Sequence, residues 1–250
     1  MISRNQLKLI HSLALKKFRD EEKAFLAEGV KLVDELLASD FNLRMIYGLA
    51  DWYASRRDSI PEAKFQEISE EELQRATGMP APNEVLAIVE IPDQSIPESS
   101  EAGKLVLLLD RIQDPGNLGT IIRTADWFGL KHIFCSPGTV DVYNPKVVQS
   151  TMGSICRVET HYTDLYQLLE TTLSDRNIYA TTMDGDNIYT ADLLIPAAII
   201  IGNESQGISK DVLVMSSHKI GIPNFSSLAE SLNASVAAGI VCSEFCRRIK

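Results

Sequence analysis

The sequence predicts an α/β protein of two domains, on three observations. Over most of its 250 residues, short apolar segments alternate with segments of helical periodicity, which is typical of a parallel sheet covered by helices. A stretch rich in Pro, Ser and acidic residues at 92–103 interrupts this alternation and indicates an exposed linker. Hydrophobic residues make up 45% of the chain and charged residues 23%, which is the composition of a globular protein with a core of normal size.

The first predicted domain, residues 1–91, is a small α/β unit. Ser3 and Gln6 form a capping-box pattern at the start of an amphipathic helix. Ser69 and Glu72 repeat the pattern and predict another helix start further along the chain. The remaining elements expected in this domain are a strand, a helix and two further strands, at 24–26, 30–37, 43–49 and 85–91.

The second predicted domain, residues 104–250, alternates strands and helices to its end. It opens with a continuous apolar run at 104–110, which is typical of a parallel strand covered on both faces. The other strands are expected at 132–135, 178–182, 197–201 and 219–222. Helices are expected at 118–128, 144–150, 165–173 and 232–248. The predicted fold is therefore a parallel sheet with helices on both faces.

Charge and cysteine content narrow the classes of function. The formal net charge of −10 argues against nucleic-acid binding over the whole surface, but it allows a local basic patch. Charge alone favours a solvated helix face for the basic residues near the N-terminus, Lys8, Lys16, Lys17 and Arg19. The four cysteines are widely spaced in apolar contexts, which indicates reduced, buried thiols of a cytoplasmic protein. Because no CxxC pair or paired histidine accompanies them, the sequence predicts no metal site.

Three polar segments follow predicted strands and carry the candidate site residues. They are Asn117-Leu118-Gly119 with Arg123, the loop from Gly202 to Gly207 with Glu204, and Ile222-Pro223 with Ser231-Leu232-Asn233. Ligands of α/β proteins bind at the carboxyl ends of strands, so the segments together predict one composite site. Taken singly, each also has a structural explanation: a turn with a surface arginine, a glycine-bounded loop, and a helix cap beside tightly packed small residues.

Other catalytic patterns are missing from the sequence. There is no GxSxG elbow, and the four histidines lie outside the three segments, which argues against a nucleophilic side chain. No Lys-Ser or Lys-Thr pair follows Gly207, so the second segment is not an NTPase phosphate loop. A nucleotide-binding oxidoreductase needs GxGxxG after its first strand, and Gly116 with Gly119 does not supply it. No apolar run is long enough to span a bilayer, so no membrane partner is expected.

In their order and separation the three segments resemble those of the SpoU (TrmH-type) RNA ribose 2′-O-methyltransferases. The likeness covers about residues 104–250. The N-terminal stretch Phe25-Leu26-Ala27-Glu28-Gly29 is similar to the substrate-binding domain common in that family, which resembles small RNA-binding ribosomal proteins. The resemblance implies direct methyl transfer from S-adenosyl-L-methionine to a ribose 2′-hydroxyl of RNA. It favours ribosomal RNA as the partner, with transfer RNA as the alternative.

The resemblance also implies a fold and a set of site residues. The C-terminal segment would pass through a loop to make a deep trefoil knot around the cofactor pocket, and the knotted domains would pair as a homodimer. Cofactor binding would fall to Gly202, Ile222 and Leu232. The catalytic residues would be Arg123, Asn117, Glu204, Ser231 and Asn233. Arg123 would assist removal of the hydroxyl proton together with the substrate phosphate, because a free guanidinium stays protonated in proteins.

One departure from the family pattern concerns the loop after Pro223. Family members commonly have a glycine shortly after this proline, where the chain has Ser226-Ser227-Leu228 and a longer loop. Because positive φ is less accessible without glycine, the loop over the cofactor is expected to differ in shape.

A non-catalytic RNA-binding protein of the same fold is the competing hypothesis from another class. Binding alone would not require all four of the polar residues in the motifs. The enzyme is therefore favoured by the presence together of Asn117, Arg123, Glu204 and Asn233.

Overall fold

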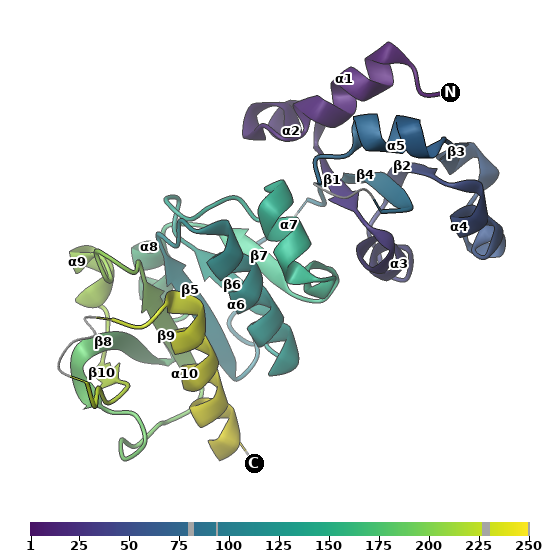
Figure 1. The fold of residues 1–250 in the computed structure, drawn as a ribbon. Coiled ribbons are helices and arrows are strands. Elements are labelled where there is room, and N and C mark those ends of the chain that lie inside the picture. The colour runs from purple at the N-terminus through teal and green to yellow at the C-terminus, as the bar shows by residue number, and fades with distance from the viewer. Residues whose placement is uncertain (80–82, 94, 227–230, 250) are drawn as a thin grey trace. The chain divides into compact units, whose positions relative to one another are not determined.

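The computed structural model describes residues 1–79, 83–93, 95–226 and 231–249. The chain divides into two compact units, each with its own β-sheet (Figure 1). Unit 1 comprises Met1–Asp93 together with Asp141–Cys156, and unit 2 comprises Gln94–Val140 together with Arg157–Lys250. The α/β class predicted from the sequence is confirmed in both units.

Unit 1 is built on a mixed four-stranded sheet. Its strands are β1 (Ala24–Glu28), β2 (Leu43–Gly48), β3 (Phe65–Glu67) and β4 (Val85–Glu90). They lie in the order β1-β4-β2-β3, with β4 antiparallel to β1 and β2, and β3 parallel to β2. The helices of the unit are α1 (Arg4–Ser12), α2 (Lys16–Glu22), α3 (Val30–Leu37), α4 (Ala50–Ala54), α5 (Glu70–Ala76) and α7 (Pro145–Thr151). Short 3-10 turns lie at Arg57–Ser59, Glu62–Lys64 and Ser154–Cys156.

Both capping boxes that the sequence predicts are present. The Ser3 hydroxyl accepts from the Gln6 backbone N–H at 3.2 Å, and the Gln6 side chain accepts from the Ser3 N–H at 2.8 Å. Ser69 and Glu72 repeat this exchange at the start of α5. Glu72 also accepts from the Ile2 N–H at 2.7 Å, and these backbone donors lower the pKa of its carboxyl. The two boxes therefore fix where α1 and α5 begin and tie the chain start to α5.

Arg19 corrects the expectation of a wholly solvated basic face, because its side chain is only 2% exposed. Its Nη1 donates to the carbonyls of Leu13 and Ala14 at 2.8 and 2.9 Å. Its Nε and Nη2 both donate to Asp141 Oδ2, at 3.0 and 2.6 Å. The neighbouring Lys17 does remain exposed, as expected. A buried ion pair thus joins the two sequence segments of unit 1.

Replacing Arg19 with methionine is expected to lower the free energy of unfolding by about 3 kcal/mol, because the largely buried Asp141 carboxylate loses its partner. Urea unfolding followed by the fluorescence of Trp52, which is buried in unit 1, measures the loss. The matched control is Lys17→Met on the exposed side of α2, which should change stability by less than about 0.5 kcal/mol. Equal stability of the two variants would show that the ion pair contributes nothing.

Unit 2 contains the parallel sheet that the apolar runs predict. Its six strands are β5 (Leu105–Asp110), β6 (His132–Cys135), β7 (Glu159–Tyr162), β8 (Asn177–Asn187), β9 (Ala197–Gly202) and β10 (His218–Gly221). They lie in the order β10-β8-β9-β5-β6-β7, and every neighbouring pair is parallel. The central strands are buried along most of their length, as the continuous apolar sequences of β5 and β9 require.

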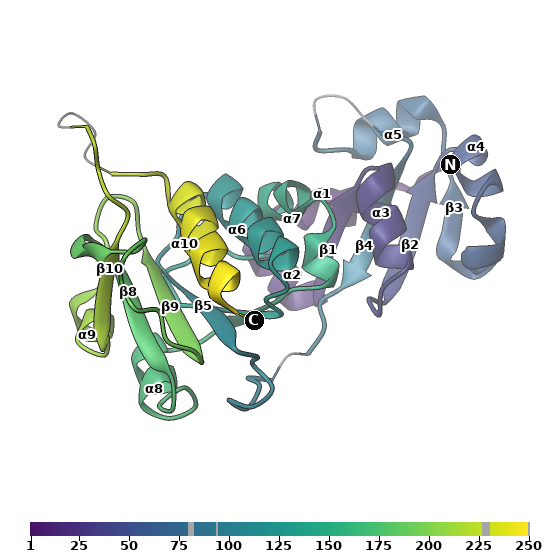
Figure 2. The same ribbon diagram turned by 90° about the horizontal axis from the view of Figure 1, so that it is seen from below.

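Helices cover both faces of this sheet. They are α6 (Pro115–Trp127), α8 (Leu165–Glu170), α9 (Lys210–Leu213) and α10 (Ala234–Arg248). Figure 2 shows α6 and α10 on one face and α8 and α9 on the other. On the first face α10 packs against α6 and β9. On the second, Leu165 and Leu169 of α8 join a buried apolar cluster with Phe134 and Ile178.

Several elements differ from the sequence expectation: α4, β3 and α9 are not predicted, and one further helix and one further strand also differ. The helix expected at 144–150 forms as α7, but its segment clusters with unit 1 and contacts β1. Strand β7 escapes sequence prediction because its residues, Glu-Thr-His-Tyr, are mostly polar. It lies at the edge of the sheet and buries only Thr160 and His161, so it carries no apolar run.

The four cysteines are all free, as expected. Cys135 and Cys242 are buried, whereas Cys156 and Cys246 are partly exposed. Across the described ranges, no helix is both long and apolar enough to cross a membrane.

Candidate active site

A cavity of about 1070 Å³ opens at the carboxyl ends of β9 and β10, the position at which α/β proteins bind ligands. Its walls come from β8, from the loops that follow β9 and β10, and from the start of α10. The three residues expected to bind the cofactor all line it: Gly202, Ile222 and Leu232. Two of the expected catalytic residues, Glu204 and Ser231, line it as well.

Hydrogen bonds join the three polar segments beside this cavity. Asn117 Nδ2 donates to Glu204 Oε1, and Asn233 Nδ2 donates to Asn117 Oδ1 at 2.9 Å. Asn117 is 9% exposed, and its backbone N–H donates to the capping Asp114 side chain at 2.8 Å. Residues that are 87 and 116 positions apart in sequence therefore form one network. The composite arrangement expected from the sequence is present for these three side chains.

Asn203 holds the loop that presents Glu204. Its Nδ2 donates to the carbonyl of Arg111 at 2.9 Å, and its Oδ1 accepts the backbone N–H groups of Ser205 and Gln206, both at 3.0 Å. Its backbone also exchanges two hydrogen bonds with Gly207, at 3.1 and 2.9 Å. The loop is thus closed on itself and anchored to the segment after β5.

Gly202 and Gly207 are required by the same loop. A Cβ on Gly202 would overlap the backbone of Gly207 and Ile208, well inside van der Waals contact. Gly207 has φ +66, a conformation that side chains other than glycine rarely adopt. The sequence pattern indicates both glycines, and the reason is close backbone approach at Gly202 and positive φ at Gly207.

The third segment supplies a helix cap as well as cavity wall. Asn233 is the N-cap of α10, and its Oδ1 accepts from the N–H of Ser235 at 2.9 Å and from the Ser235 hydroxyl at 2.6 Å. The sequence favours Ser231 as the cap of this helix, whereas the structure places the cap two residues later, on the site residue Asn233. In the loop after Pro223, which departs from the family pattern, Asn224 Oδ1 accepts from the Ser226 N–H at 2.7 Å. Ser227 and Leu228 stand where family members commonly have a glycine, and they lie outside the described residues.

Arg123 stands apart from the other candidates. It lies on α6, six residues after Asn117, and its side chain is exposed. At about 100° per residue the two side chains leave the helix on different faces. Arg123 does not line the cavity, and it has no hydrogen-bond or ion-pair partner within the described part of the chain. Its guanidinium is thus available to a phosphate from outside the chain.

Sequence reasoning missed the contribution of β8. Thr181, Thr182 and Met183 line the cavity, although they lie within a strand rather than at its end. They do so because the pairing of β10 with β8 jumps between Lys219 and Ile220. A Cβ on Gly221 would come within 2.8 Å of the Thr182 carbonyl oxygen, so this glycine permits the approach. Gly221, inside the strand expected at 219–222, was the available signal.

Two family descriptions match the chain. The SpoU rRNA methylase family matches residues 104–243, a range that contains all three polar segments. The MRM3-like substrate binding domain matches residues 4–87, which include the N-terminal stretch Phe25-Leu26-Ala27-Glu28-Gly29.

Known proteins are similar over nearly the whole chain. The 23S rRNA (guanosine(2553)-2′-O)-methyltransferase RlmP of Bacillus subtilis is 31% identical over 234 residues, which are 92% of this chain and 91% of the relative. The AdoMet-bound structure of an rRNA methyltransferase from Sinorhizobium meliloti is 28% identical, with a TM-score of 0.87 over 100% of this chain and 98% of that one. A TrmH-family protein from Porphyromonas gingivalis is 37% identical, with a TM-score of 0.89 over 99% of both chains. The chain therefore belongs to the SpoU rRNA methylase family.

Proposed function

We propose that the protein transfers a methyl group from S-adenosyl-L-methionine to a ribose 2′-hydroxyl of RNA. The observation that carries this proposal is the hydrogen-bonded network of Glu204, Asn117 and Asn233 beside the cavity. The membership of the SpoU family and the 2′-O-methyltransferase name of the Bacillus relative agree with it. A non-catalytic RNA-binding protein would have no need to link these polar groups at a cofactor-sized cavity.

The cavity fits the cofactor in size and in the chemistry of its walls. Ile222 and Leu232 supply apolar surface for an adenine ring, and Gly202 keeps the backbone of the following loop close to the cavity. A pocket of mainly apolar walls with a few placed polar groups is typical for such ligands. When bound, S-adenosyl-L-methionine supplies a methyl group activated by its sulfonium. The AdoMet-bound relative from Sinorhizobium meliloti supports this choice of cofactor.

The catalytic roles follow from the positions of the side chains. Glu204 accepts from Asn117 and so fixes its amide, while Asn233 fixes the other side of the same amide. Ser231 shapes the cavity wall next to Asn233. Arg123, exposed and permanently charged, binds a substrate phosphate and polarises the ribose hydroxyl. Catalysis then rests on orienting the hydroxyl and assisting its deprotonation.

Ribosomal RNA is the substrate that the comparisons favour. The name of the Bacillus relative gives 23S rRNA as its substrate. The match to the MRM3-like substrate binding domain covers most of unit 1. We assign RNA binding to residues 1–91, methyl transfer to residues 104–250, and the connection between them to 92–103. The net charge of −10 means that RNA is bound locally rather than over the whole surface. A cytoplasmic location agrees with the free cysteines.

A trefoil knot and a homodimer complete the proposal. The pairing of β10 moves from Ala180 to Asp186 of β8, so residues 181–185 of β8 bulge beside β10, and this irregularity supports threading of the C-terminal segment. Pairing of two copies is supported by large apolar side chains that α6 and α10 expose. Trp127 is 84% exposed and Val236 is 50% exposed. Exposed apolar surface of this kind marks interaction sites.

Calorimetry with S-adenosyl-L-methionine tests the function first. We expect one cofactor bound per chain, and S-adenosyl-homocysteine should compete for the same site. Mapping of ribose 2′-O-methyl groups in a strain that lacks the protein should then show the loss of one modification, expected in 23S rRNA. Absence of binding at millimolar cofactor contradicts the enzyme proposal. If the strain loses a methyl group from tRNA alone, the proposed methyltransferase activity stands, but its substrate is tRNA instead of rRNA.

A further inference from the structure

A cluster of two histidines and a glutamate lies away from the candidate active site, on the sheet of unit 2. His132 is the first residue of β6 and pairs in register with Glu159, the first residue of β7. His161 follows two positions later on β7, so its side chain leaves the same face of the sheet as that of Glu159. The parallel register therefore gathers all three side chains on one face at the amino ends of the strands. The cavity lies at the carboxyl ends.

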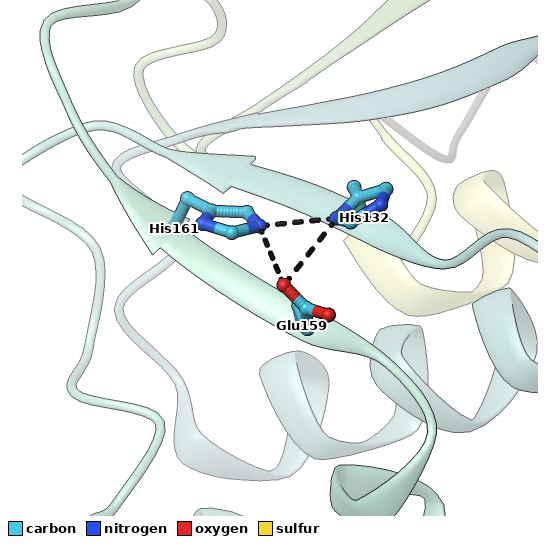
Figure 3. A group of neighbouring side chains, drawn as sticks. All are labelled: His132, Glu159 and His161. Atoms are coloured by element: carbon cyan, nitrogen blue, oxygen red, sulfur yellow. Dashed lines mark hydrogen bonds and ion pairs between the residues drawn. The ribbon is translucent and has the colours of Figure 1, made fainter. Parts of the chain in front are cut away.

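The ligand atoms of these side chains converge on one point. Figure 3 shows His132 Nδ1, His161 Nε2 and one oxygen of Glu159 turned toward one another. The two nitrogens are 3.1 Å apart, and the Glu159 oxygen is 3.7 Å from His132 Nδ1 and 3.6 Å from His161 Nε2. Across the described residues, this is the sole group of three or more His, Cys, Asp or Glu side chains whose ligand atoms lie close enough together to hold a metal ion.

The triangle has the size of one face of a zinc tetrahedron. With ligands ~2.05 Å from zinc, the edge between two ligand atoms of a regular tetrahedron is about 3.3 Å. The observed edges of 3.1, 3.6 and 3.7 Å bracket that length. Three ligands on one face of an octahedron around an ion ~2.1 Å away would lie only about 3.0 Å apart. The spacing therefore favours tetrahedral over octahedral coordination.

The chemistry of the side chains also suits a metal. A neutral imidazole nitrogen is a metal ligand, and each of the two rings turns one nitrogen toward the other. One ring donates its N–H to the other in the structure. Transfer of that hydrogen to the second nitrogen of the same ring leaves both facing nitrogens with free lone pairs. Glu159 is exposed, so an ion can enter from solvent and meet a negative charge.

We propose that His132, Glu159 and His161 bind a zinc ion that clamps the edge strand β7 to β6. Two imidazole nitrogens and one carboxylate oxygen form a donor set typical of zinc, with the fourth position left to water. Such a link stabilises an edge strand most when the strand has few buried side chains. Strand β7 buries only Thr160 and His161. The ion would stabilise the sheet without taking part in methyl transfer, since it lies at the opposite edge from the cavity.

Zinc titration of the full-length protein, stripped of metal by a chelator, tests the proposal. We expect one zinc per chain, competed by a chromophoric chelator, and a rise in the melting temperature on binding. Glu159→Gln is the leading variant, because its side chain is exposed and the change keeps its shape. It should weaken zinc binding by at least about 100-fold, more than the loss of an outer-shell partner. His161→Gln should do the same.

Two controls separate this site from other zinc binding. His11→Gln removes a histidine of unit 1 that bonds the Arg75 carbonyl at 2.9 Å, and it should leave zinc affinity unchanged. Cobalt(II) in place of zinc should give the visible spectrum of a tetrahedral nitrogen–oxygen site without thiolate charge-transfer bands. Burial raises the pKa of Cys242 to about 12, so its thiol is a poor competitor. Absence of zinc binding, equal binding by Glu159→Gln, or a thiolate spectrum would overturn the assignment.

Discussion

Replacing Arg123 with alanine is expected to reduce methyl transfer by roughly 10²–10⁴-fold, the range of a lost group that assists proton transfer. The cofactor should still bind with unchanged affinity, because Arg123 does not line the cavity. The reason for the loss is that the exposed guanidinium is the cationic group of α6 that we assign to the substrate phosphate. Single-turnover methylation of RNA and calorimetry with S-adenosyl-L-methionine measure the two properties separately.

The controls for Arg123 distinguish a specific role from general charge. Lys104→Ala removes an exposed basic residue just before β5, at the amino end of that strand. This variant should leave the rate nearly unchanged. Arg123→Lys keeps the charge but loses the planar fork, so it should recover only part of the activity. Near-normal turnover of Arg123→Ala would remove this residue from the mechanism, whatever the cofactor affinity.

Replacing Gly202 with alanine is expected to abolish cofactor binding and with it methyl transfer. The added Cβ would overlap backbone atoms of Gly207 and Ile208, and backbone cannot move aside as a flexible side chain can. The loop that presents Glu204 must shift, which breaks its hydrogen bond to Asn117. Overpacking of this kind typically costs about 1–3 kcal/mol of stability, so the variant should still fold. Calorimetry with the cofactor measures the loss, and circular dichroism verifies the fold.

Gly239→Ala is the matched control for Gly202. It lies inside α10, and a Cβ there would meet no atom within 4 Å. Alanine is the better helix former, so this variant should fold at least as well as the wild type and retain its cofactor affinity. Cofactor binding by Gly202→Ala equal to that of Gly239→Ala would show that the tight loop is not part of the pocket.

Local sequence determined a large part of the fold. The apolar runs of β5 and β9 predict a parallel sheet because a strand covered on both faces has no polar side. Capping boxes at Ser3 and Ser69 predict helix starts because the bonds involved span three residues. Edge strand β7 escapes prediction because its burial depends on a neighbouring strand rather than on its own pattern.

The sequence by itself determined which residues are polar at strand ends, and the order of the three motifs made the family resemblance specific. Tertiary structure alone decided that Asn117, Glu204 and Asn233 form one network while Arg123 lies outside the cavity lining. It also decided that Arg19 is buried against Asp141, and that His132 meets Glu159 and His161. The physical reason is the same in each case. These contacts join residues far apart in the chain, so they depend on strand order, register and helix rotation, which local patterns do not encode.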